Sequence, residues 1–187
     1  MKKTWIIIGG ILLFIVILIS TLFGRYNLLV TKNESVKTAW SQVDVQLQRR
    51  FDLIPNLVET VKGFAKQERD VFIQVTEARS KVGQASAIPD KIAANNQLTG
   101  ALSRLLLVVE RYPELKSNQN FIQLQDELAG TENRIAVARR RYNEEVKEYN
   151  QSIRQVPNNI IASMFNFQPA AYYEIPPEAK ATPKVSF

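Results

Sequence analysis

One long amphipathic stretch, residues 33–82, limits the possible folds of this chain more than any other feature. Apolar residues return in it every three or four positions, which is the spacing of one face of an α-helix. They are Val36, Trp40, Val43, Leu47, Phe51, Ile54, Val58, Val61 and Ala65, followed after a polar interruption at Glu68 by Phe72, Val75, Ala78 and Val82. Asn33 can cap the first turn of such a helix. Pro55 removes one backbone hydrogen bond, so we expect a kink or a short break there.

Two further stretches show the same spacing. The first, residues 98–112, ends before Pro113, and the second covers residues 118–156. Their apolar positions are Leu98, Leu102, Leu105, Val109 and Tyr112, and then Phe121, Leu124, Leu128, Ile135, Ala138, Tyr142, Val146, Tyr149, Ile153 and Val156. We therefore predict an all-α fold, in which residues 33–156 form an antiparallel up-and-down bundle of three to four long helices.

The chain changes character after Pro157. We predict that residues 157–187 form one short apolar helix around Ile160 and Met164, followed by a short extended, Pro-rich tail. The tail ends in Val185 and Phe187, and such apolar residues need cover, so we expect part of it to dock on the bundle. The alternative is that the free C-terminus binds a partner as an added strand.

The N-terminal region predicts a membrane span. Residues 5–23 carry no charge, and this run has about the length that an α-helix needs to cross the apolar core of a bilayer. We divide the region into a flank (1–4), a transmembrane helix (5–24) and a juxtamembrane linker (25–32). A cleaved signal peptide is less consistent with the length of the run and with its flanks. The positive residues on the two sides are almost balanced and do not select an orientation.

Composition excludes several classes of chemistry. The chain contains no cysteine and no histidine, so the usual ligands of zinc, haem and iron–sulfur centres are missing, as are catalytic triads with a histidine base. The formal net charge of +6 is modest, and no glycine-rich phosphate loop or aromatic platform for nucleic acid is present. We expect no catalytic residue, no metal, no cofactor and no binding of nucleic acid.

Several segments resemble the LemA family. They are YNLLV (26–30), ESVKTAWSQVDVQLQRRFDLIPNLVETVKGFA (34–65), VTEAR (75–79), ERYPELKSNQNFIQLQDELAGTENRIAVARRRYN (110–143) and VKEYNQSI (146–153). The resemblance implies a bacterial single-pass cell-membrane protein with a soluble bundle of long helices and without an established enzymatic activity. Some relatives of this type are associated with membrane remodelling or organelle formation, which implies a scaffold role. Phe64 and Asn166 stand where the family often has Tyr and Gly.

A set of arginines forms the main candidate site. Its members are Arg49, Arg50, Arg134, Arg139, Arg140 and Arg141. If the long helices pack antiparallel, some of these residues share a face, and this face contacts anionic lipid headgroups or an acidic partner. The alternative, which we favour, is a solvated surface on which the arginines form ion pairs with acids such as Glu132 and Glu144. The repeated Tyr-Asn pairs at Tyr142 and Tyr149 fit core positions, with the asparagines bonding across the bundle.

These observations together predict a non-enzymatic interaction or scaffold module anchored in the membrane. Its partners are the lipid bilayer and either a second copy of the chain or another protein. The alternative is a membrane-bound ligand or signal sensor, which transmits a helix movement through the juxtamembrane segment.

Overall fold

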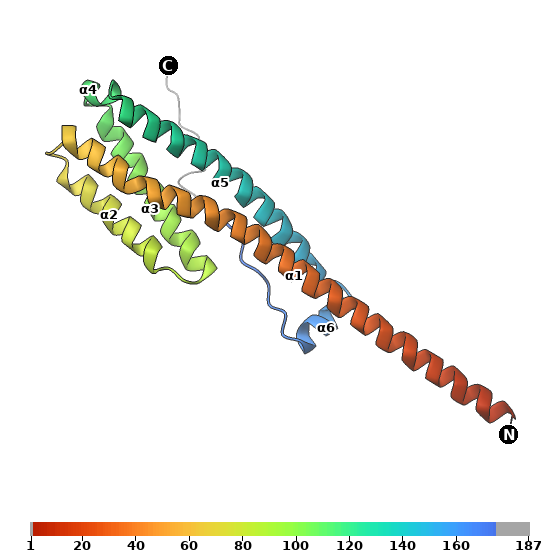
Figure 1. Cartoon of the computed structure of the whole chain (residues 1–187). Helices are drawn as coiled ribbons and strands as arrows, with labels where there is room; N and C mark the ends of the chain where they lie inside the picture. Colours follow the sequence, from red (N-terminus) through yellow and green to blue (C-terminus); the bar gives the residue numbers. More distant parts are fainter. Residues whose placement is uncertain (1, 175–187) are drawn as a thin grey trace, which may run out of the picture. The chain divides into compact units, whose positions relative to one another are not determined.

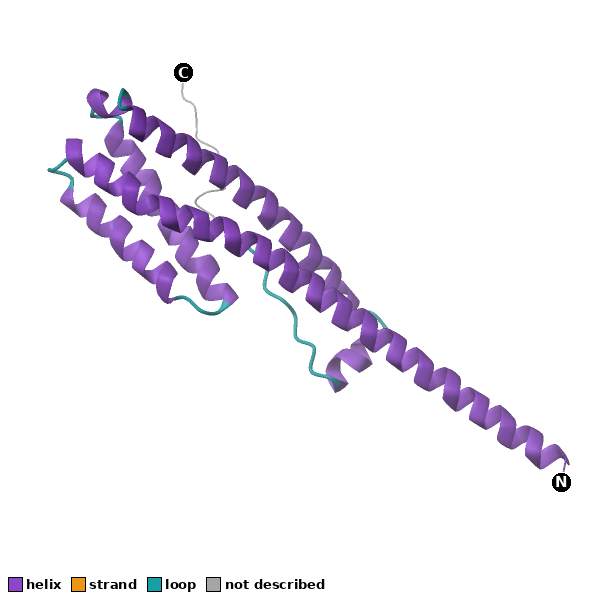
Figure 2. Ribbon diagram, in the orientation of Figure 1, coloured by secondary structure: helices purple, strands orange, loops and turns teal. Residues whose placement is uncertain are grey.

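The computed structural model describes residues 2–174, with side chains described for residue 5 and residues 7–174. Within these residues the secondary structure is helical, without a strand (Figure 2). The helices are α1 (Lys2–Phe64), α2 (Arg69–Gln84), α3 (Ile88–Val109), α4 (Pro113–Lys116), α5 (Gln119–Ser152) and α6 (Asn158–Met164) (Figure 1). The predicted all-α class is therefore confirmed.

The chain divides into two compact units. Unit 1 consists of Met1–Ala39 and Tyr142–Ala170, and unit 2 of Trp40–Arg141 and Ala171–Phe187. Helices α1 and α5 each supply residues to both units, whereas α2, α3 and α4 belong to unit 2 and α6 belongs to unit 1. We describe each unit by itself.

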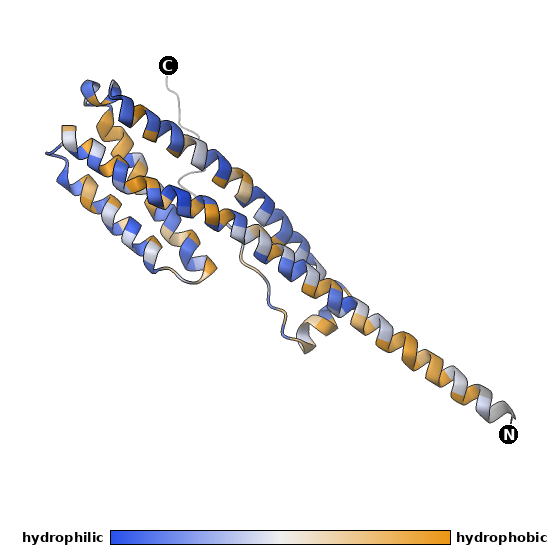
Figure 3. Ribbon diagram, viewed as in Figure 1, coloured by the Kyte–Doolittle hydropathy of each residue, from blue (hydrophilic) through white to orange (hydrophobic). Residues whose placement is uncertain are grey.

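Helix α1 begins with the apolar stretch, which Figure 3 shows as the orange N-terminal part of the ribbon. Of the helices in the described residues, α1 is the one that is long and apolar enough to cross a membrane, judged by length and composition. All side chains from Ile7 to Arg25 are exposed. An apolar helix surface of this length without protein cover is typical of a segment whose surroundings are lipid.

The expected start at Asn33 is wrong, because α1 runs through this position without a break. The segment 25–32, expected as a linker, is also helical. The reason is local: residues 25–33 contain neither proline nor glycine, so nothing ends the helix after the apolar stretch. A preference for a cap cannot begin a helix where the preceding turn is already helical.

Pro55 lies inside α1, and the helix continues past it. Of the two expected outcomes, a kink or a short break, the break is therefore absent. Proline leaves the carbonyl four residues earlier without its intrahelical donor. In unit 2 the Nε of Arg79 donates to that carbonyl of Phe51 at 3.4 Å, and the Arg79 guanidinium lies 4.0 Å from the centre of the Phe51 ring. A side chain of α2 thus compensates in part for the missing backbone bond.

The break lies instead at residues 65–68, between α1 and α2. The single helix expected over 33–82 is therefore two helices. The apolar pattern lapses at Glu68, and this residue has the non-helical backbone of an N-cap. The pattern resumes because α2 buries Phe72, Val75 and Ala78 in the same core of unit 2 that the end of α1 enters.

The core of unit 2 lies between α1, α2, α3 and the first part of α5, with short connections between successive helices. Figure 1 shows α2 and α3 running side by side in opposite directions. The core contains Ile54, Leu57, Val58, Val61, Ala65, Phe72, Val75, Ala78, Leu98, Ala101, Leu102, Leu105, Val108, Val109, Leu115, Phe121 and Leu128. Asn118 caps α5, since its Oδ1 accepts the backbone N–H of Phe121 at 3.0 Å. The predicted up-and-down bundle is confirmed in this unit.

Unit 1 is held together by the segment that follows α6. The Tyr149 hydroxyl donates to the carbonyl of Gln168 at 2.9 Å, and the Asn150 side chain makes two 2.9 Å hydrogen bonds with the backbone of Ala170. Tyr142 and Tyr149 are buried, as expected for positions on the apolar stripe. The ring of Tyr26 on α1 lies 4.8 Å from that of Phe165, which brings the end of α6 against α1.

The turn after α6 depends on Asn166, which has a φ of 56°. The N–H of Phe167 reaches the carbonyl of Ala162 at 2.9 Å, and the N–H of Asn166 reaches that of Ser163 at 3.4 Å. This bond pattern is the Schellman motif, which requires a left-handed residue at the position of Asn166. Glycine and asparagine adopt this backbone more readily than other residues do.

We predict that Asn166→Ala lowers the free energy of unfolding of the full-length chain in detergent by about 1 kcal/mol, because a Cβ without a polar group disfavours positive φ. Asn166→Gly is the matched control, and we expect it to be neutral or slightly stabilising. Chemical denaturation followed by circular dichroism measures both. Equal effects of the two substitutions would contradict this explanation of the turn.

Candidate functional site

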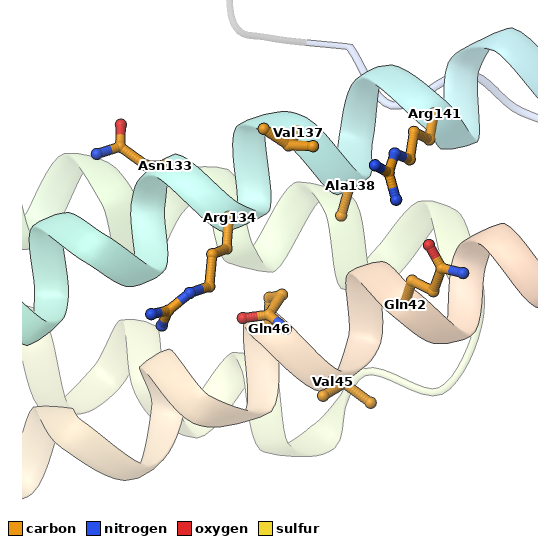
Figure 4. Close-up of a pocket in the computed structure, with 8 residues that line it drawn as sticks. All are labelled: Gln42, Val45, Gln46, Asn133, Arg134, Val137, Ala138 and Arg141. Carbon is orange, nitrogen blue, oxygen red and sulfur yellow. The ribbon is translucent and has the colours of Figure 1, made fainter.

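A groove lies between α1 and α5 on the surface of unit 2, with a volume of about 480 Å³. Its lining residues are Gln42, Val45 and Gln46 of α1 and Asn133, Arg134, Val137, Ala138 and Arg141 of α5 (Figure 4). Val45 and Val137 are 63% and 46% exposed. They lie beside the buried stripe rather than on it, so each helix presents an extra apolar residue to solvent. The groove therefore has exposed apolar side chains from both helices.

Two arginines give this groove a positive charge. Arg134 and Arg141 are seven residues apart on α5, so they lie on the same side of the helix, about 10 Å apart along its axis. In Figure 4 both side chains extend from α5 toward α1. Neither arginine has an ion-pair partner in the part of the chain that the structure describes, and no acidic residue lines the groove.

Gln46 adds an unsatisfied polar atom to the same groove. Its Oε1 is buried and has no hydrogen-bond partner among the described residues. A buried acceptor without a donor costs free energy, and a bound group that brings a donor would remove that cost. The groove thus combines apolar surface, two cations and one free acceptor.

A second exposed surface of unit 2 lies on the outer side of α2. It consists of Asp70, Ile73 and Glu77, which we call the α2 ridge. Ile73 is 53% exposed, whereas Phe72 and Val75 beside it are buried. Neither Asp70 nor Glu77 has an ion-pair partner among residues 2–174. The ridge therefore has one exposed apolar residue flanked by two free carboxylates.

Arg50 does not lie on an exposed basic face, which corrects the expectation from the sequence. It is only 2% exposed and is enclosed by helices of unit 2. Its Nη1 donates to Glu132 at 2.9 Å and to Thr99 at 3.0 Å, and its Nη2 donates to Oδ1 of Asn95 at 2.8 Å. The guanidinium thus joins α1, α3 and α5, and a buried cation is tolerated because it is paired and hydrogen-bonded.

The pattern of the sequence contains a signal for this burial. Position 50 is three residues after Leu47 and four before Ile54, so it fits the apolar stripe as well as Phe51 does. A charged residue at a stripe position predicts a buried charge with partners on neighbouring helices. Asn95 is buried in the same way, three residues after Ile92 and three before Leu98.

The structure separates the other arginines of the predicted set. Arg49 and Arg140 are exposed, and Arg139 is half-buried. Consecutive helical residues point about 100° apart, so Arg139, Arg140 and Arg141 cannot share one face. Arg134 and Arg141 are the pair that the groove brings together. Contact of the set with anionic lipid or with an acidic partner stays a prediction.

Part of the C-terminal tail docks on unit 2, as expected. Tyr173 is buried, its ring centre lies 6.4 Å from that of Trp40, and the Arg139 guanidinium is 5.8 Å from it. Asn96 donates from its side chain to the carbonyl of Glu174 at 3.2 Å. Val185 and Phe187, for which docking was also expected, lie outside the described residues.

Burial raises the pKa of the Tyr173 phenol. The positive charges of Arg50 and Arg139 act in the opposite direction without cancelling this effect, and Glu132 adds to the rise. Burial also raises the pKa of Tyr142 and of Tyr149 in unit 1. All three tyrosines are therefore uncharged at neutral pH, and they act as apolar rings with a polar edge.

The acidic side chains of the described residues are dispersed or engaged in ion pairs. Among them there is no group of three or more acids that could hold a metal ion. Glu144 and Glu148 share a face of α5, but Glu148 pairs with Lys32, and the hydrogen bond from Lys32 lowers the pKa of its carboxyl group. What the arrangement offers is an apolar, cationic groove suited to binding.

Comparison with known proteins identifies relatives across most of the chain. A family model described as the LemA family matches residues 39–187. The magnetosome proteins MamQ 2 and MamQ 1 of Paramagnetospirillum magneticum (strain ATCC 700264 / AMB-1) are each 30% identical to it, over 88% of this chain and 70% of their own length. The protein LemA of Metamycoplasma hominis is 23% identical, over 81% of this chain and 69% of its own length.

We predict that Arg50→Ala lowers the free energy of unfolding by about 3 kcal/mol, since it leaves Asn95 and Glu132 without their shared partner and opens a cavity. Arg49→Ala removes the same side chain from the exposed neighbouring position. This control is expected to change stability by less than about 0.5 kcal/mol. Denaturant titration of the full-length chain in detergent compares the two, and similar losses would contradict the role assigned to Arg50.

A pH dependence follows from Tyr173. Above about pH 10 the unfolded chain releases its phenol protons, while the folded chain retains that of Tyr173 to a higher pH. The folded state then binds more protons, so the free energy of unfolding falls as pH rises through this range. We expect Tyr173→Phe to reduce that fall. Denaturation midpoints measured at about pH 8 and about pH 10.5 test this expectation.

Proposed function

The chain belongs to the LemA family, and we propose that it is a non-enzymatic scaffold protein, anchored in the cell membrane by the apolar part of α1, that assembles with further copies of itself. The length and exposure of that apolar segment support the anchor. The relatives named magnetosome proteins carry the name of a cellular structure and not of a reaction, which is in keeping with a structural role.

One observation carries the proposal of self-assembly. The groove presents Arg134, Val137 and Arg141 at spacings of three and four residues. The α2 ridge presents Asp70, Ile73 and Glu77 at the same two spacings. Because the spacing along a helix is regular, one register places both carboxylates against both arginines and the exposed isoleucine against the exposed valine.

The charges support this pairing in preference to other surfaces. Arg134 and Arg141 lack acidic partners within the described chain, and Asp70 and Glu77 lack basic ones. Four free charges of complementary sign at matched positions favour the contact between groove and ridge, and like charges disfavour groove with groove or ridge with ridge. The contact joins two different surfaces, so each copy uses its groove toward one neighbour and its ridge toward another.

The alternative, a ligand or signal sensor, stays a prediction. The helix movement that such a sensor transmits would pass through residues 25–32, which are helical. Within unit 1 this segment is held by the contact of Tyr26 with Phe165 and by the ion pair of Lys32 with Glu148. We prefer the scaffold, because the groove and the α2 ridge match each other in spacing and in charge, whereas the groove does not select one particular small ligand.

Charge reversal tests the scaffold in vesicles of phosphatidylcholine. The groove variant carries R134E with R141E, and the ridge variant carries D70R with E77R. Each variant brings charges of the same sign together at the contact, so we expect self-association to weaken about tenfold. The chain has no cysteine, so a Gln123→Cys background, at an exposed position of α5, takes donor and acceptor dyes for energy-transfer measurements.

Mixing the two variants gives the decisive comparison. In the mixture, the negative groove of the first variant can pair with the positive ridge of the second. The unchanged ridge of the first and the unchanged groove of the second also pair as in the wild type, so we expect association to return. Two controls change charge by the same amount at exposed residues outside the contact: R49E with R140E, and D126R with E127R. Association that stays low in the mixture, or controls that weaken it equally, would rule out the groove–ridge contact.

A further inference from the structure

The short helix α6 presents an uncovered apolar side. Ile160 and Met164 are 59% and 69% exposed, and Phe165 at the end of the helix is 54% exposed. Ile160 and Met164 are four residues apart within α6, whereas Val156, which is 80% exposed, precedes the helix. Helical residues four apart lie on the same side. The opposite side is buried within unit 1 through Ile161 and Ala162, so Ile160 and Met164 form a separate exposed surface, with Phe165 at its edge against Tyr26.

The position of this surface is set by Tyr26. The rings of Phe165 and Phe167 lie 4.8 Å and 5.8 Å from the ring of Tyr26, all within unit 1. Tyr26 follows the last residue of the apolar stretch, Phe23, by three residues, which is about 4.5 Å along the helix axis. The apolar side of α6 therefore lies at the level of α1 where the apolar stretch gives way to polar residues.

A membrane crossed by residues 5–23 has its headgroup boundary at this level. Tyrosine is enriched at such boundaries, because its ring favours the apolar side and its hydroxyl favours water. Short helices with apolar residues on one side lie in the same layer, with that side buried in the region between headgroups and acyl chains.

We infer that α6 is a second membrane contact, which lies in the interface of the bilayer with Ile160, Met164 and Phe165 among the upper acyl chains. The inference rests on the proposed anchoring of α1 in the membrane. It assigns a ligand to the exposed apolar side, namely the lipid at the headgroup boundary. It also explains why unit 1 ties the segment after α6 to α5 through Tyr149 and Asn150.

Quenching by brominated lipids tests this placement in the full-length chain. A bimane dye is attached at Met164→Cys, and the protein is reconstituted in phosphatidylcholine vesicles whose lipids carry bromine either near the headgroup or near the chain ends. The matched control is Asn159→Cys, an exposed position on the polar side of the same helix. We expect lipids brominated near the headgroup to quench the dye at position 164 about threefold more than the dye at position 159.

A third label separates this inference from the anchoring that it depends on. A dye at Ile15→Cys, in the middle of the apolar stretch, reports the span through quenching by lipids brominated near the chain ends. Quenching at position 15 together with equal, weak quenching at positions 164 and 159 overturns the inference about α6 and leaves the anchor in place. Absence of quenching at position 15 overturns the anchor itself, and the inference fails with it.

Discussion

The buried guanidinium of Arg50 is the interaction on which the arrangement of unit 2 depends. A cation that loses its hydration is stable only where several partners meet it with good geometry, and here they come from α3 and α5. Those partners are themselves positioned by bonds along α3, where Asn95 donates to the carbonyl of Lys91 at 2.9 Å and Thr99 donates to that of Asn95 at 3.0 Å. Apolar seams supply most of the stabilisation, but they tolerate sliding. The polar cluster allows one register, as a buried polar residue does in a coiled coil.

The sequence predicts the seams well, because helical spacing is a local property that burial enforces over many turns. It predicts the ends of helices less well. Asn33 has the right chemistry for a cap, but the residues before it contain nothing that ends a helix, so the chain passes through. At residues 65–68 the helix does end. A single polar residue on the apolar stripe, Glu68, marks the turn between α1 and α2. Arg50 shows a different limit: spacing allows either residue 50 or residue 51 on the stripe, and the partners that decide between them lie on other helices.

The candidate groove depends on a pairing that the sequence does not contain. Val45 and Val137 are recognisable as apolar residues outside the main stripes, but they are far apart in the chain, and only the packing of α5 beside α1 brings both into one groove. The arginines show the same limit. Their number suggests one basic face, whereas the packing buries one, half-buries another and leaves two in the groove. The complementary spacing of the α2 ridge can be read from the sequence, but its relevance appears only once both surfaces are known to be exposed.

A contact built from three residues on each side is small compared with stable interfaces between proteins in solution. Confinement to a membrane changes this balance. Chains anchored by the same kind of segment share a thin layer and a common orientation, which raises their effective concentration and removes part of the entropic cost of association. A contact that joins two different surfaces continues from copy to copy, and it ends only if the rotation between copies closes a ring. Weak individual contacts then suffice for an assembly that is extended along the membrane yet remains reversible, and a second lipid contact at α6 strengthens the same confinement.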